Sequence, residues 1–239
     1  MTTKIVCDNV SLKEIVNERY NKCNEIIDVS DLDTSNVTSF NSLFRNFKKL
    51  VLIKGLNTLD TSNVTDLTAM CCSCRLLSQL DLSNLNLSKV TKMSSMCDSC
   101  HALTKLDLTG CNLSNVTKLS CMCSGCFSLP ELNLSNLNLV NITCLAGLCD
   151  RCYALKKLDL SDCNTSKVFK MTLMCCNCFS LRELNLSGCD LSRVNGSHNM
   201  CKNCNSLQTF MPPRKTPRNS IKWEETYGQI IALLDSHSQ

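Results

Sequence analysis

Apolar positions recur along this chain with a period of 26 residues. One position holds Val or Ile in seven successive units, first 27 and then 26 residues apart: Val37, Val64, Val90, Val116, Ile142, Val168 and Val194. A leucine follows it by 13 residues in every unit: Leu50, Leu77, Leu103, Leu129, Leu155, Leu181 and Leu207. Because one unit of this length cannot bury its apolar face alone, neighbouring units stack around a shared core. The pattern predicts a solenoid of about seven coils.

Each unit also carries a shorter pattern. Leu103, Leu106, Leu108, Cys111 and Leu113 read L-x-x-L-x-L-x-x-C-x-L, the leucine-rich-repeat signature. The alternation of leucine with polar residues predicts a short strand, which would pair in parallel with the next coil about 4.8 Å away. Apolar residues at i, i+3, i+4 and i+7 over residues 93–100 predict one to two turns of helix or 3₁₀-helix on the opposite side. The predicted fold class is an α/β repeat solenoid, a right-handed leucine-rich-repeat solenoid with a short strand and a short helix in each coil.

Polar side chains repeat in the same register. Four residues before the Val position the chain holds only Asp or Asn: Asp33, Asp60, Asn86, Asn112, Asn138, Asn164 and Asp190. Side chains of this kind bond the backbone of turns. We therefore expect a polar ladder that satisfies turn backbone and links neighbouring coils.

The beginning of the chain departs from the repeat. Residues 1–30 are expected to form an N-terminal helical cap, because the first coil of a solenoid exposes its apolar core. Ser11 and Glu14 have the spacing of a capping box, which predicts a helix from there to about Cys23. Residues 31–211 are then the leucine-rich-repeat solenoid itself.

The end of the chain also departs from the repeat. Residues 212–219 are basic and rich in Pro, which predicts an extended linker. Residues 220–239 predict a C-terminal helix that begins at a cap on Ser220 and runs to about Leu234. This helix either folds back as a second cap or docks on a partner protein or subunit, a role that suits a helix on a Pro-rich tether.

Composition narrows the function classes. The net charge is only +4 over 239 residues, which does not predict a nucleic-acid binder. No run of 18 apolar residues predicts a membrane span, and the first residues lack the apolar segment of a signal peptide. The 21 cysteines are an odd number, which favours free thiols in a reducing compartment. We expect an intracellular location or a place in a larger assembly such as a virus particle, or the cell surface if a leader is missing.

Many of the cysteines form C-x-x-C pairs that recur in six units. In the first unit both positions are phenylalanine, Phe44 and Phe47. A position that accepts Phe and Cys interchangeably is expected to be a buried packing position, which requires no cofactor. Two alternatives remain. Disulfides between coils are geometrically possible, and two adjacent pairs could form a Cys₄ zinc site from Cys97, Cys100, Cys123 and Cys126.

The remaining cysteines of the repeats fall into two groups. Cys111, Cys163 and Cys189 share a position with Leu85 and Leu137, which predicts packing in the core. A second group is expected to be more exposed and therefore more reactive: Cys72, Cys121, Cys144 and Cys176.

The repeat resembles a known family. The segments LDTSNVTSF (32–40), LDTSNVTDL (59–67) and LDLSNLNLSKVTKMSSMCDSC (80–100) are similar to the 26-residue repeats of BspA-type leucine-rich-repeat proteins, also called bacterial surface protein repeats. The resemblance covers about residues 30–210. It implies a solenoid used for adhesion or protein binding, and it brings no catalytic residues. Two departures are the missing export signal and the replacement of M-F-x-x-C by M-C-x-x-C.

One column of the repeat predicts a surface for a partner. It directly follows the second cysteine of each pair and holds Arg75, His101, Phe127, Tyr153 and Phe179. Exposed aromatic residues tend to mark interfaces, although stacking between coils would explain the same column. Trp223 and Tyr227 of the C-terminal helix are further candidates.

The sequence therefore predicts a non-enzymatic scaffold that binds protein or assembles with itself. The strand face is expected to alternate Lys and Glu between coils and so to neutralise itself. The alternatives are an exported surface adhesin of the BspA type and a thiol-rich metal-binding protein.

Overall fold

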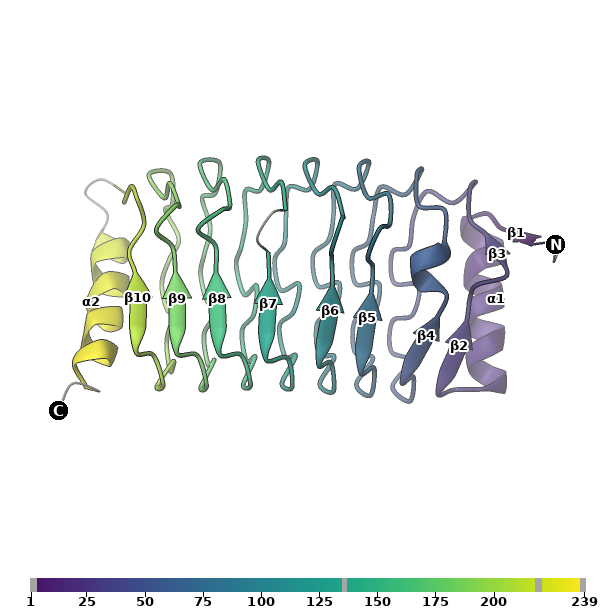
Figure 1. Cartoon of the computed structure of the whole chain (residues 1–239), viewed down its shortest axis with the longest axis horizontal. Helices are drawn as coiled ribbons and strands as arrows, with labels where there is room; N and C mark the ends of the chain where they lie inside the picture. Colours follow the sequence, from purple (N-terminus) through teal and green to yellow (C-terminus); the bar gives the residue numbers. More distant parts are fainter. Residues whose placement is uncertain (1–3, 135–136, 218–220, 237–239) are drawn as a thin grey trace.

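The chain folds into an elongated solenoid with a helix at each end, as the computed structural model shows for residues 4–134, 137–217 and 221–236 (Figure 1). One long face carries eight short strands in chain order: β2 (Ile26–Asp28), β4 (Leu52–Lys54), β5 (Gln79–Asp81), β6 (Lys105–Asp107), β7 (Glu131–Asn133), β8 (Lys157–Asp159), β9 (Glu183–Asn185) and β10 (Thr209–Met211). The predicted repeat solenoid is confirmed. It has about eight turns rather than seven, because β2 lies within the segment expected to be only a cap.

The strands pair in parallel in the register that the repeat demands. Leu158 of β8 pairs with Leu184 of β9, and Leu80 of β5 pairs with Leu106 of β6, so partners lie 26 residues apart. A second parallel ladder, here called the bridge ladder, consists of single bridged residues: Ser39, Asp66, Lys92, Lys118, Cys144, Lys170 and Gly196. Each coil is thus hydrogen-bonded to its neighbours on more than one side.

The strand ladder is interrupted between β4 and β5 and again between β6 and β7, where Figure 1 shows a wider spacing. Pro130 directly precedes β7 at the second interruption. In the neighbouring coils the equivalent residues donate a backbone N–H to the preceding coil, as Thr104 does to the Ser78 carbonyl (2.9 Å) and Lys156 does to the Pro130 carbonyl (3.0 Å). Proline has no N–H to donate, so this rung lacks the bond that would close the ladder.

The turn side of the coils contains no regular helix in the described residues, contrary to the prediction of a short helix in each coil. Instead the chain makes consecutive turns with two left-handed residues per coil, such as Ser95 (φ 55°) and Ser99 (φ 61°). Alternate backbone N–H groups of these turns bond to the next coil, for example Cys97 N to Met122 O at 2.8 Å. The apolar spacing that suggested a helix arises from these turns, because they too bring every third or fourth side chain inward.

The core is a single apolar column that runs the length of the solenoid. The Val and Leu positions of the repeat are almost fully buried, as are the Met residues of the turns, for example Val116, Leu129 and Met122. The Asp or Asn column forms the expected polar turns, in which the side chain accepts the N–H two residues later, as Asn112 does from Ser114 (3.0 Å). Corner asparagines link the coils, since Asn115 donates to the Ser88 carbonyl at 2.6 Å.

The N-terminal cap is helix α1 (Asn9–Lys22), whose Leu12 and Val16 enter the core. The helix begins earlier than predicted. Its N-cap is Asp8, which forms a capping box with Ser11, so Ser11 is the third residue of the helix rather than its cap. Before it, β1 (Ile5–Val6) pairs with β3 (Leu32–Asp33).

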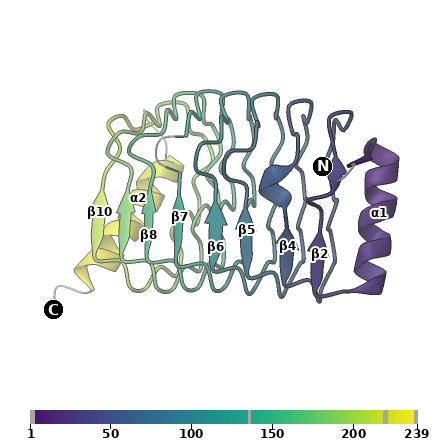
Figure 2. The same ribbon diagram turned by 45° about the vertical axis from the view of Figure 1, so that its right-hand side comes forward.

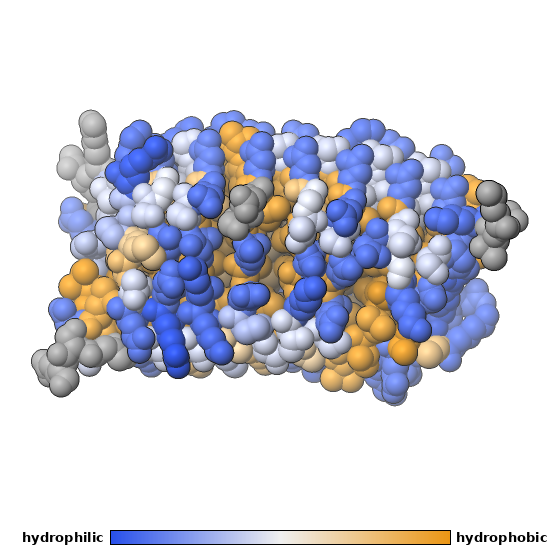
Figure 3. All heavy atoms as spheres, in the orientation of Figure 1, coloured by the Kyte–Doolittle hydropathy of each residue, from blue (hydrophilic) through white to orange (hydrophobic). Residues whose placement is uncertain are grey.

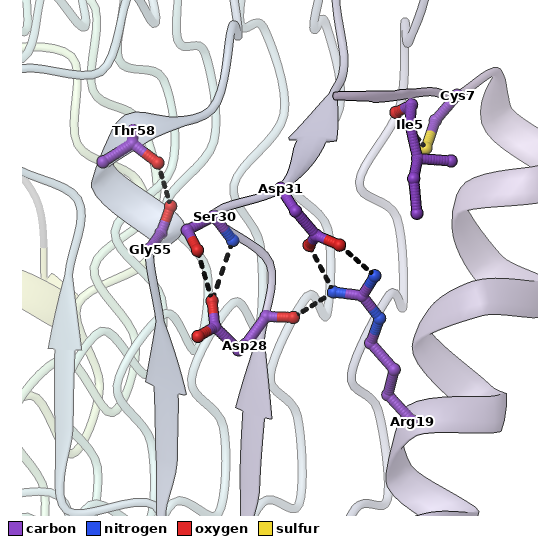
Figure 4. Close-up of polar contacts among 8 residues, drawn as sticks. All are labelled: Ile5, Cys7, Arg19, Asp28, Ser30, Asp31, Gly55 and Thr58. Atoms are coloured by element: carbon purple, nitrogen blue, oxygen red, sulfur yellow. Dashed lines mark hydrogen bonds and ion pairs between the residues drawn. The ribbon is translucent and has the colours of Figure 1, made fainter. Parts of the chain in front are cut away.

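An ion pair fixes α1 against the first coil. Arg19 donates two hydrogen bonds to the Asp31 carboxylate (2.7 and 2.9 Å) and a third to the Asp28 carbonyl (Figure 4). The Arg19 guanidinium lowers the pKa of Asp31. In the next coil, Gly55 precedes the short 3₁₀-helix η1 (Leu56–Thr58), and its left-handed φ of 73° brings it against Ser30.

The C-terminal helix α2 (Ile221–Asp235) packs on the last coils, where Figure 2 shows it running obliquely across the end of the solenoid. Trp223 and Ile230 are buried in the common core, and Thr226 donates to the Ser197 carbonyl at 3.0 Å. The preceding segment is not a free linker in its described part, because the Lys215 ammonium bonds Asp190 at 2.9 Å. Some parts of the predicted segments lie outside the described residues. They are the expected cap residue Ser220 and residues 1–3, 218–219 and 237–239.

Candidate binding surfaces

The aromatic column forms one continuous stack along the edge of the solenoid. The ring centroids of His101 and Phe127 are 4.2 Å apart, those of Phe127 and Tyr153 4.6 Å, and those of Tyr153 and Phe179 5.1 Å. Adjacent rings are nearly parallel, with interplanar angles of 11°, 8° and 24°. We call these four residues the aromatic row. Successive coils place equivalent side chains one rung apart, so the repeat alone creates the stack.

The exposure of the aromatic row increases along the chain. His101 and Phe127 are half-buried, whereas Tyr153 is 37% and Phe179 44% exposed. Arg75 precedes His101 in the same column and is exposed. Burial and the nearby Arg75 guanidinium lower the pKa of His101, which favours the neutral ring in the stack. The row therefore combines stacking between coils with an open aromatic face at its C-terminal end.

The structure does not bring the other two candidates to this surface. Trp223 is only 5% exposed and belongs to the core, so its ring seals the end of the solenoid and is not presented to a partner. Tyr227 is 38% exposed and lies at the end of the solenoid, where its ring centroid is 6.0 Å from that of Phe210. Neither residue belongs to the aromatic row.

The C-x-x-C pairs form a ladder of thiol hydrogen bonds. The second cysteine of each pair donates its S–H to the backbone carbonyl of the preceding coil: Cys74 to Phe44, Cys100 to Cys71, Cys126 to Cys97, Cys152 to Cys123, Cys178 to Cys149 and Cys204 to Cys175, at 2.9–3.2 Å. Cys111 and Cys189 donate in the same way to the Leu82 and Leu160 carbonyls. A thiol is small enough to pack like an apolar residue and can still donate a second hydrogen bond to a buried carbonyl that already accepts a backbone N–H, which Ala or Val cannot do.

The thiols are free, and in the described part of the chain no group of three or more Cys, His, Asp or Glu is arranged to hold a metal ion. Cys97, Cys100, Cys123 and Cys126 are all fully buried among leucine and methionine, and the thiols of Cys100 and Cys126 point to carbonyls rather than to a shared centre. Burial raises the pKa of the Cys100 thiol well above its ordinary value. In this structure the cysteines of the pattern that suggested zinc occupy packing positions of the core.

The group of cysteines expected to be exposed is mostly buried. Cys72 and Cys144 are 8% and Cys176 is 4% exposed, and only Cys121 is half-buried. The turns of neighbouring coils pack closely on one another, and this packing covers the side chains of these cysteines. The exposed cysteine is Cys23, the residue that ends α1.

The thiol ladder predicts different effects for two substitutions of equal size. Cys97 and Cys126 are both fully buried, but only Cys126 donates a hydrogen bond to a carbonyl. Cys126→Ala removes one of the two hydrogen bonds that the Cys97 carbonyl accepts, while the bond from the Cys100 N–H (3.1 Å) remains. It should therefore lower the free energy of unfolding by about 0.5–1.5 kcal/mol more than Cys97→Ala does. Urea unfolding of both variants measures the difference. Equal losses would show that the thiols act only by volume.

The strand face is polar and largely neutralised by its own charges, as predicted. The Lys157 ammonium bonds Glu183 of the next strand at 2.8 Å and lies 3.5 Å from Asp159, and the Lys105 ammonium lies 3.1 Å from Asp107. Figure 3 shows this face as polar side chains standing over an apolar floor. Hydrogen bonds from Thr109 and the Lys105 charge lower the pKa of Asp107 to about 2.

A cleft of about 490 Å³ opens on the strand face at the interruption between β6 and β7. Lys105, Asp107, Thr109 and Glu131 line it, and Leu106 lies in it partly exposed. The sequence carried a signal for this cleft, namely a proline at a position where the neighbouring coils need an N–H donor. The periodicity of the apolar residues does not contain that signal.

A family model described as "Mycoplasma protein of unknown function, DUF285" matches residues 11–131 and again residues 98–212, which together cover most of the solenoid. The chain belongs to the DUF285 family. The two overlapping matches reflect the internal repeat, because a repeat array aligns with the same model in more than one register. No curated protein matches the chain.

Solved structures similar to this DUF285 protein are leucine-rich-repeat proteins. A leucine-rich repeat protein from Eubacterium ventriosum has a TM-score of 0.35 and 12% identity over 84% of this chain and 83% of its own. An internalin from Listeria monocytogenes has a TM-score of 0.32 and 14% identity over 84% and 75%. A TLR13–ssRNA13 complex has a TM-score of 0.44 and 20% identity over 87% of this chain, which spans only 28% of the TLR13 chain.

The two helices in the described residues are short. Neither α1 nor α2 has both the length and the apolar character required to cross a lipid bilayer.

Proposed function

We propose that this DUF285 protein is a non-enzymatic scaffold that binds another protein through the exposed end of the aromatic row. The observation that carries the proposal is the open face of Tyr153 and Phe179, which are 37% and 44% exposed although the rest of the row is half-buried. Large exposed aromatic residues on a rigid support are typical of interface hot spots. The solenoid supplies that support, because every coil is hydrogen-bonded to the next.

Cationic side chains around the exposed rings favour a protein partner with acidic residues at its rim. Arg151 and Lys156 flank Tyr153 in sequence, and Arg182 follows Phe179, and all three are exposed. Asp150 lies 3.7 Å from Arg151 and pairs with it. An aromatic centre with a charged rim is the usual anatomy of a protein interface.

Adhesion of the BspA type is a second form of the same proposal. It is supported by the resemblance of the repeats to BspA-type repeats and requires that the protein reach a cell surface. In that case the partner is a surface protein of another cell or of a host. The aromatic row would be the contact in either setting, so a single test of the row addresses both.

Site-specific photo-crosslinking tests the proposal with a matched control. A benzoylphenylalanine placed at Phe179 should crosslink a defined protein in cells that express the chain. The same probe at Phe169, which is equally exposed (43%) but lies outside the row, should not crosslink that protein. Phe179→Ser should then abolish co-purification of that protein, whereas Phe169→Ser should leave it unchanged. Identical products from both positions, or none from position 179, would contradict the proposal.

A further inference from the structure

The side of the solenoid that carries the bridge ladder holds six exposed cations. Three belong to the bridge ladder itself, namely Lys92, Lys118 and Lys170. Three more lie at the corner that precedes it in the chain: Lys89, Lys167 and Arg193. We call these six residues the basic row. They lie in four of five successive coils. The middle coil holds the neutral residues Asn141 and Cys144 at the same two positions.

Among the described residues, one of the six cations of the basic row is paired with a carboxylate. In the described residues the carboxylate that pairs with it is Asp66, 3.6 Å from the Lys92 ammonium. Lys92 and Lys118 are direct neighbours in the bridge ladder, an arrangement of like charges that destabilises a sheet. On the strand face, by contrast, opposite charges are neighbours, since the Lys157 ammonium bonds Glu183 of the next strand at 2.8 Å. Charges of one sign therefore accumulate on this side, where an external anion can offset their repulsion.

One aromatic ring lies within the basic row. Phe169 is 43% exposed and occupies the ladder position between Thr143 and Asn195, flanked in sequence by Lys167 and Lys170. The same position in the earlier coils is Thr38, Thr65, Thr91, Thr117 and Thr143. Unlike the members of the aromatic row, Phe169 stacks on no other ring in the described part of the chain. Its face is thus available to a flat ligand.

We propose that the basic row binds single-stranded nucleic acid, with the cations on phosphates either side of the neutral middle coil and one base stacked on Phe169. Four rung spacings of about 4.8 Å make the row about 19 Å long. A nucleic-acid strand carries one charge per about 3.4 Å of helix axis, so five or six phosphates match the six cations. A basic track with an aromatic stacking platform is how proteins hold single strands without reading their sequence. The small net charge of +4 predicts no such binding, but it averages over faces that carry opposite charges.

Fluorescence anisotropy with a labelled twelve-nucleotide oligo(dT) tests the proposal on the full chain. The logarithm of the association constant should fall with the logarithm of salt concentration with a slope of about −0.7 per phosphate contact. The triple variant Lys92→Gln, Lys118→Gln, Lys170→Gln should weaken binding at least tenfold and reduce that slope by about 2. The control variant Lys13→Gln, Lys49→Gln, Lys54→Gln makes the same change in net charge elsewhere and should change neither quantity.

Two further arms separate the ligand class. Phe169→Ser should weaken oligo(dT) binding about five- to tenfold without changing the salt slope, because it removes stacking and no charge. Heparin and vesicles of anionic phospholipid should bind more weakly than oligo(dT) and should not respond to Phe169→Ser. Equal loss in both triple variants would overturn the proposal, as would tighter binding to heparin or vesicles. Circular dichroism of each variant shows that the solenoid is intact.

Discussion

Raising the pH above 9 is expected to unfold the solenoid cooperatively. Burial and neighbouring thiols raise the pKa of eight thiols of the two C-x-x-C columns well above the ordinary value: Cys71, Cys97, Cys100, Cys123, Cys149, Cys175, Cys178 and Cys201. Cys204 is the exception, because hydrogen bonds with Cys175 and Cys201 lower its pKa to about 5. Burial also raises the pKa of Cys111 and Cys189 to about 11 and that of Cys163 to about 12. In the unfolded chain all these thiols ionise near pH 8.5.

The sign of the pH dependence follows from these pKa values. Above about pH 8.5 the folded state holds more protons than the unfolded state, so stability falls as the pH rises towards the folded pKa values. Each such thiol contributes about 1.4 kcal/mol per pH unit. A typical domain is stable by only about 5–15 kcal/mol, so about ten thiols exhaust that stability within one to two pH units. Below pH 8 the stability should be independent of the thiols whose pKa is raised.

Absorbance and circular dichroism recorded together measure this transition. Thiolate absorbance near 240 nm should rise in the same step in which the β-sheet signal is lost. Substituting Leu for Cys111, Cys163 and Cys189 uses the residue that the repeat itself places at Leu85 and Leu137, and it should lower the slope of stability against pH by about 4 kcal/mol per unit. A gradual rise of thiolate absorbance near pH 8.5 with the sheet intact would contradict the burial of the thiols.

The sequence was sufficient to predict the solenoid because a stacked coil places equivalent residues one above another. Val116, Leu129 and Cys123 must therefore be apolar and small enough for every coil, and a period of 26 follows directly. The same logic predicted that Phe127, Tyr153 and Phe179 lie in one row. It could not predict whether the row stacks or faces solvent, because both arrangements place an aromatic residue at the same position, and the structure shows that it does both.

The helix expected in each coil was wrong for a physical reason. A turn with left-handed residues at Ser95 and Ser99 brings Met93, Met96 and Cys97 inward at nearly helical spacing. Only the backbone distinguishes the two, since alternate N–H groups, such as that of Cys97, bond the next coil, whereas those between them, such as that of Asp98, bond a carbonyl three residues back. The basic row and the Pro130 cleft were missed for a different reason. Both depend on which residues of distant units become neighbours, whereas net charge and apolar periodicity average over those neighbours.

Gly188→Ala and Gly228→Ala are expected to change stability in opposite directions. A Cβ at Gly188 would lie 1.7 Å from the Ser161 carbonyl oxygen and 2.8 Å from its carbonyl carbon, so the coil and its neighbour would have to separate. Backbone atoms of a hydrogen-bonded ladder cannot move aside as a flexible side chain can. Overpacking of this kind typically costs about 1–3 kcal/mol, and a clash with backbone places Gly188→Ala at or above the upper end.

Gly228 gives the matched control, because the same methyl group meets no atom within 4 Å there. It lies in α2 on an exposed position, where Ala is favoured over Gly by about 0.5–1 kcal/mol. Urea unfolding should therefore place Gly228→Ala above the unaltered chain and Gly188→Ala well below it. Since α2 covers the last coil, a stabilising effect in the common unfolding transition would also show that the helix unfolds together with the solenoid. A separate early transition for α2, or a neutral Gly188→Ala, would contradict the close stacking of coils on which the whole fold depends.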